Sequence, residues 1–113
     1  MDVNGELLMK KFNDIMKLVY EEYIANGYLD MWTVDEEHQP VYNLAEAGLF
    51  HTECAETQEG VRKSNYKNVA EECADVVIRV MNFCSRMGID LEDEIIKKHD
   101  KNLTRGKKHG KDI

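Results

Sequence analysis

The sequence predicts an all-α protein, a bundle of four helices that forms a single domain over residues 1–113. This length suffices for one hydrophobic core, because domains commonly contain about 100–200 residues. Charged residues make up 33% of the chain, above the usual share of about 25%, which favours amphipathic helices over buried strands. Apolar residues recur at helical spacing in separate segments, which supports the same fold class.

The first helix is expected over residues 6–26, where apolar side chains follow one another at helical steps. Gly27 can end it in a left-handed conformation. Residues 28–43 lose the periodicity and contain the only Pro and the only Trp, Pro40 and Trp32. We therefore expect an ordered loop there.

A second helix is expected from about residue 44 to residue 62. Asn43 and Glu46 have the spacing of a capping box, which marks the start of a helix. The pattern predicts that its inner side carries Leu44, Ala47, His51, Ala55 and Gln58.

A third helix is expected to start near Asn68, which has capping-box spacing to Glu71, and to end at Met87 before Gly88. It is the most apolar segment and should be the most buried. Asp90 should cap a fourth helix, which continues past Leu103 until the Gly- and Lys-rich end of the chain.

Charge and cysteine content exclude several classes of protein. The net charge is −7, and residues 97–113 are basic while residues 1–96 are acidic, which is not the broad basic face of a nucleic-acid-binding protein. Three cysteines without CxxC spacing indicate neither a disulfide framework nor a zinc site. The chain shows no membrane span and no signal peptide, so we expect a cytoplasmic protein with no membrane partner.

A short motif occurs twice, as ECAE from Glu53 to Glu56 and as ECAD from Glu72 to Asp75. On a helix, side chains three residues apart share a face, so each motif presents two carboxylates together. If the two helices pack against each other, the four carboxylates cluster and must take up protons or bind cations. Oxygen ligands of this kind favour Mg²⁺, with Mn²⁺ as an alternative. A solvated acidic face explains the same residues without a metal.

The pattern ExxE, a 15-residue spacer and ExxD resembles the signature of the MazG-like all-α nucleotide pyrophosphohydrolases. The resemblance extends over residues 44–108 and includes the segment "GIDL" and a last helix carrying Lys98, Asn102 and Arg105. Thr52 stands where many members have a further Glu. These motifs are more specific than four acidic residues alone.

The resemblance implies hydrolysis of a nucleoside triphosphate, (d)NTP, to the monophosphate and pyrophosphate, for example in nucleotide-pool cleaning. The motif acids would hold Mg²⁺, and Glu53 or Glu56 would also accept the proton of the attacking water. The family further implies a homodimer or a dimer of dimers.

Other residues are candidates for substrate binding. Lys98, Asn102 and Arg105 share a helical face that suits the terminal phosphates, although a solvated basic face has the same spacing. Trp32 could stack on the base or anchor its loop. The alternative to an enzyme is a helical interaction module with an acidic, metal-binding face.

Overall fold

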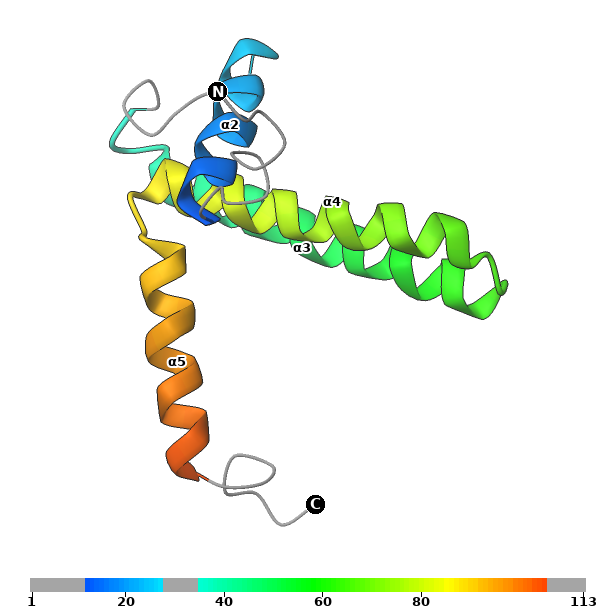
Figure 1. Ribbon diagram of the computed structural model, residues 1–113. Helices are drawn as coiled ribbons and strands as arrows, with labels where there is room; N and C mark the ends of the chain where they lie inside the picture. The colour runs from blue at the N-terminus through cyan, green and yellow to red at the C-terminus, as the bar shows by residue number, and fades with distance from the viewer. Residues whose placement is uncertain (1–11, 28–34, 106–113) are drawn as a thin grey trace, which may run out of the picture.

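The computed structural model describes residues 12–27 and 35–105, and these residues form four helices and no strand (Figure 1). The helices are α2 (Phe12–Ala25), α3 (Gln39–Arg62), α4 (Tyr66–Met87) and α5 (Leu91–Arg105). The predicted all-α class is confirmed. None of the described helices is both long and apolar enough to cross a membrane.

Helices α3 and α4 form a long antiparallel pair that dominates the structure (Figure 1). The chain reverses between them through Ser64, which has a left-handed φ of 56°. Helix α4 begins at Tyr66 and not near Asn68, because the Asn65 side chain accepts a hydrogen bond from the Asn68 backbone N–H at 3.4 Å and caps the helix. At this closed end the helices approach closely, since a Cβ on the buried Gly60 would lie 3.0 Å from Val69 Cγ2.

Helix α3 begins at Gln39, several residues before the predicted start. Pro40 lies in its first turn, where the missing N–H of proline has no helical partner to lose. The predicted loop is therefore wrong for residues 39–43, and residues 28–34, with Trp32, lie outside the described part of the chain.

The inner side of α3 also differs from the prediction. Leu44 is 74% exposed, and His51, Ala55 and Gln58 are exposed as well. The side that packs against α4 instead carries residues at steps of three and four, namely Glu46, Phe50, Glu53, Thr57 and Gly60. The prediction failed because it assumed that apolar residues face inward, whereas the acidic motif occupies the packing face.

A small core fixes α2 across the second half of α4 (Figure 1). Met16, Met81 and Cys84 form its buried centre. Around them pack the partly buried side chains of Phe12, Val19, Val80, Phe83 and Leu91. The core includes residues from α2, α4 and the start of α5, so it lies at the end of α4 that is farthest from the α3–α4 turn.

Aromatic contacts join α3 to the same end of α4. Phe50 and Phe83 meet edge to face with ring centroids 5.4 Å apart. The guanidinium of Arg86, only 3% exposed, lies 4.6 Å from the centre of the Tyr42 ring. Both arrangements are favourable beyond simple burial.

Helix α5 leads away from the α3–α4 pair and contacts α2 near its own first turn (Figure 1). Asp90 caps it as predicted, since its Oδ1 accepts from the Asp93 backbone N–H at 3.1 Å, and Asn13 of α2 hydrogen-bonds Asp90 at 3.3 Å. The radius of gyration is 17.0 Å, whereas a compact chain of this length would have about 13 Å. A single chain therefore leaves much of its apolar surface uncovered.

Gly88 ends α4 with φ 70°, and its backbone N–H contributes to the cap. We predict that Gly88→Ala lowers the free energy of unfolding by about 1 kcal/mol, because a Cβ disfavours this left-handed backbone. Gly88→Asn should cost less, since Asn tolerates that conformation. Urea denaturation at fixed protein concentration measures both changes, and equal stability of the two variants would contradict this account.

Candidate metal and substrate site

The antiparallel pairing of α3 and α4 brings the two acidic motifs together. Glu53, Glu56 and Glu72 each offer a carboxylate oxygen that lies within 4.8 Å of the others. Glu53 is 12% exposed, so this group is partly withdrawn from solvent. Asp75, the fourth predicted ligand, is not part of this close triplet and lines a cavity beside it together with Glu53.

The carboxylates repel one another, and the effect is visible at Glu72. Its pKa is raised, chiefly because its protonated form shares a hydrogen bond with Glu56, and further by desolvation and by the charges of Glu56, Asp75 and Glu53. Glu72 Oε2 is buried and has no other hydrogen-bond partner among the described residues. The cluster is thus short of positive charge.

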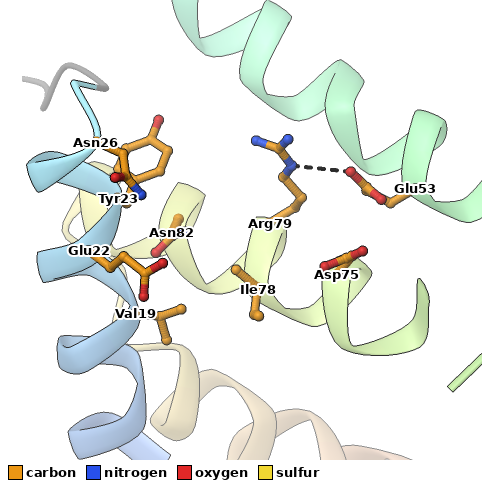
Figure 2. Close-up of a pocket in the computed structure, with 9 residues that line it drawn as sticks. All are labelled: Val19, Glu22, Tyr23, Asn26, Glu53, Asp75, Ile78, Arg79 and Asn82. Atoms are coloured by element: carbon orange, nitrogen blue, oxygen red, sulfur yellow. Dashed lines mark hydrogen bonds and ion pairs between the residues drawn. The ribbon is translucent and has the colours of Figure 1, made fainter. Parts of the chain in front are cut away.

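Arg79, on α4, places a positive charge next to the acidic cluster. Its Nε lies 3.4 Å from Glu53 Oε1 (Figure 2). Arg79 lies one helical turn after Asp75 on α4. Its side chain reaches across to α3, and its contact with Glu53 fixes the orientation of that carboxylate. The partly exposed guanidinium, at 29%, remains accessible from the cavity.

The predicted phosphate-binding residues are not near the acids within one chain. Lys98 and Asn102 line a shallow depression on α5, and Arg105 is the last residue of that helix. Because α5 leads away from the α3–α4 pair, the described part of the chain does not bring these side chains to the acidic cluster (Figure 1).

Sequence reasoning missed the residues on the far side of the cavity. The cavity has a volume of about 350 Å³ and extends from the acids toward α2, and its far side is lined by Tyr23 of α2, Asn26 of the following turn and Asn82 of α4 (Figure 2). A signal existed on α4, where polar residues recur at steps of three and four within an otherwise apolar pattern. They are Glu72, Asp75, Arg79, Asn82 and Arg86.

In the described residues, carboxylates from two packed helices lie close enough together to hold a single divalent cation. The family model of the MazG nucleotide pyrophosphohydrolase domain matches residues 46–109, and the chain belongs to this family. The match includes both acidic motifs and α5. Comparisons with curated proteins and with solved structures found no significant match.

The donor set fits a hard divalent cation. All close donors are carboxylate oxygens, and two oxygens that each lie about 2.0–2.6 Å from a shared ion are at most about 4–5 Å apart. The separations within 4.8 Å among Glu53, Glu56 and Glu72 agree with this limit. Glu72 Oε2, buried without a donor, gains a partner if a cation binds.

We predict that Mg²⁺ stabilises the folded protein and that Glu72→Gln removes most of this effect. A ligand that binds only the native state adds about 2.7 kcal/mol at a concentration of about 100 Kd. Without metal, Glu72→Gln should itself raise the melting temperature, because one of the repelling charges is lost. Thermal melts with EDTA and with increasing Mg²⁺ measure both effects.

Glu71→Gln is the matched control, since Glu71 is exposed on the same helix outside the cluster. This variant should respond to Mg²⁺ like the wild type. An equal response of Glu72→Gln would show that the cation binds elsewhere.

Proposed function

We propose that this protein is a Mg²⁺-dependent nucleoside triphosphate pyrophosphohydrolase that converts (d)NTP to (d)NMP and pyrophosphate. The observation that carries the proposal is the carboxylate triplet on the packing face of α3 and α4, in a chain of the MazG family. Mn²⁺ is the alternative cation, because it accepts the same oxygen ligands.

The reaction adds water to the α-phosphorus and breaks its bond to the oxygen that bridges the α- and β-phosphates. A bound divalent cation would neutralise phosphate charge and make a bound water more acidic. Glu53, Glu56, Glu72 and Asp75 are the residues that would hold it. Glu53 or Glu56 would take the proton of the attacking water, and Arg79 would keep the Glu53 carboxylate oriented through its 3.4 Å contact.

We further propose that the protein works as a homodimer or homotetramer in which a second copy supplies α5 to the acidic cluster. Large apolar side chains are exposed on α5 and on the outer side of the α3–α4 pair, among them Leu44, Val77, Ile96 and Leu103. The basic residues of α5 complement the acidic cluster in charge. Lys98, Asn102 and Arg105 would then bind the β- and γ-phosphates of a substrate held by the other copy.

Neutralising the acids tests the activity. Glu53→Gln, Glu56→Gln, Glu72→Gln and Asp75→Asn should each lower pyrophosphate release by at least about 100-fold, because metal stabilisation of transition-state charge is worth several kcal/mol. The assay measures pyrophosphate from each common ribo- and deoxynucleoside triphosphate with Mg²⁺.

Glu59→Gln and Glu71→Gln are the controls for these variants. Glu59 pairs with Arg62 and Lys63 outside the cluster, and Glu71 is exposed, so both variants should keep wild-type rates. If the wild type releases no pyrophosphate from any nucleotide, the protein is instead an interaction module, for which its exposed apolar surfaces would provide the contacts.

Mixing two impaired variants tests whether the site is shared between copies. Arg105→Ala alone should lower kcat/KM about tenfold or more, since a charge-assisted phosphate contact is worth roughly 1.5–3 kcal/mol. Refolding Glu53→Gln together with Arg105→Ala should produce mixed assemblies in which one site has both intact residues, and activity should exceed the sum of the separate variants.

Two outcomes would overturn this arrangement. One is a monomer at micromolar concentration by light scattering with full activity. The other is a mixture of the two variants that is no more active than its parts although exchange of subunits is demonstrated.

A further inference from the structure

A polar stripe runs along the side of α4 that faces α2 and α3. Its members follow Glu72 at steps of three and four, and Asn82 is its fourth residue. Polar side chains on the packing side of a helix are costly unless they are hydrogen-bonded. The proposed metal site accounts for the acids and Arg79 on this side of the helix. It does not account for Asn82.

Asn82 is 7% exposed, and its Oδ1 has no hydrogen-bond partner within residues 12–27 and 35–105. A buried acceptor without a partner destabilises the fold. Asn82 also lines the cavity of about 350 Å³ that Glu53 and Asp75 line at its other end (Figure 2). Oδ1 itself has almost no exposed surface, but a half-turn of the carboxamide, which exchanges Oδ1 and Nδ2, would present it to the N–H group of a ligand next to the carboxylates.

The dimensions and the walls of the cavity suit one part of a nucleotide. Asn82 comes seven residues after Asp75, which separates them by about 10 Å along the helix. This span is comparable to a sugar and its base when the α-phosphate lies at the acids. Val19 and Ile78 add apolar wall, and the ring of Tyr23 is 6% exposed.

We propose that this cavity binds the nucleoside end of the substrate and that Asn82 selects the base by accepting a hydrogen bond from its ring or exocyclic N–H. The assignment rests on the proposed hydrolysis of nucleotides. Asn26, in the turn that follows α2, is a second carboxamide that lines the cavity. Carboxamides suit this role, because bases differ in their pattern of donors and acceptors and a carboxamide offers one of each. Asn82 is a specificity residue and takes no part in bond breaking.

Replacing the side chain tests the assignment. The values of kcat/KM for the four common ribonucleoside and four deoxynucleoside triphosphates are measured for the wild type, Asn82→Ala and Asn82→Leu. In both variants kcat/KM for the preferred base should fall about tenfold or more, and the ratios between bases should shrink to within a few-fold, because the lost contact is specific to the base.

Asn68→Ala is the matched control, since Asn68 lies on the same helix near the α3–α4 turn and outside the cavity. It should keep the wild-type preference. The melting temperatures with Mg²⁺ and without nucleotide should not fall for Asn82→Leu, which replaces an unpartnered amide by an apolar group of similar size. The Mg²⁺-dependent stabilisation should also be unchanged, and this separates base selection from damage to the metal site.

The nucleoside monophosphate product provides a readout that does not depend on turnover. The monophosphate of the preferred base should raise the melting temperature of the wild type more than the other monophosphates do, and Asn82→Ala should abolish this difference. A wild type that hydrolyses no nucleotide would defeat the proposed function itself. Hydrolysis with base ratios unchanged in both Asn82 variants, or a change only in the ratio of ribo- to deoxynucleotides, would overturn the assignment of Asn82 to the base.

Discussion

The repulsion among carboxylates on the packing face of α3 and α4 is the constraint on which the rest of the structure depends. Glu53 and Glu72 occupy positions where a helix pair normally places apolar side chains, and Glu56 lies at the exposed edge of the same cluster. The nearby Arg79 forms an ion pair with Glu53. The carboxylates in the middle of the helix pair therefore repel one another. A bound cation would attract all of them and so hold the two helices together.

The distribution of the core follows from this constraint. Close contacts occur at both ends of the pair, with Gly60 against Val69 at the turn and the cluster of Met16, Met81 and Cys84 at the other end. Large apolar side chains are exposed on the outer surface, Leu44 and Val77 among them. An assembly that covers them would stabilise the fold and complete the site through the same contacts, so subunit contact and catalysis would be linked.

The fold class, the C-terminal end of α4, the start of α5 and the pairing of the acidic motifs could be predicted from the sequence, because helical periodicity, Gly88 and Asp90 are local signals. The inner side of α3 could not be predicted, because apolar residues are spread almost equally over several faces of this helix. In addition, acidic residues occupy the packing side, where apolar residues are normally expected. The position of α5 relative to the acids depends on tertiary contacts of its first turn with α2, which no spacing reveals. Asn82 was overlooked because its position in the polar stripe of α4 becomes apparent only when the whole helix is considered, and it belongs to no short motif.

Helix α4 carries both the groups proposed to hold the cation and the residue proposed to select the base. The distance between these functions is set by the rise of the helix, about 1.5 Å per residue, and cannot change without an insertion. The opposite wall belongs to α2, which is attached to α4 mainly through the Met16 and Met81 packing. Substitutions in α2 can therefore alter the width and polarity of the cavity while the carboxylates on α3 and α4 stay in place. This arrangement would let one reaction serve different nucleotides, because the chemistry and the choice of base depend on separate helix contacts.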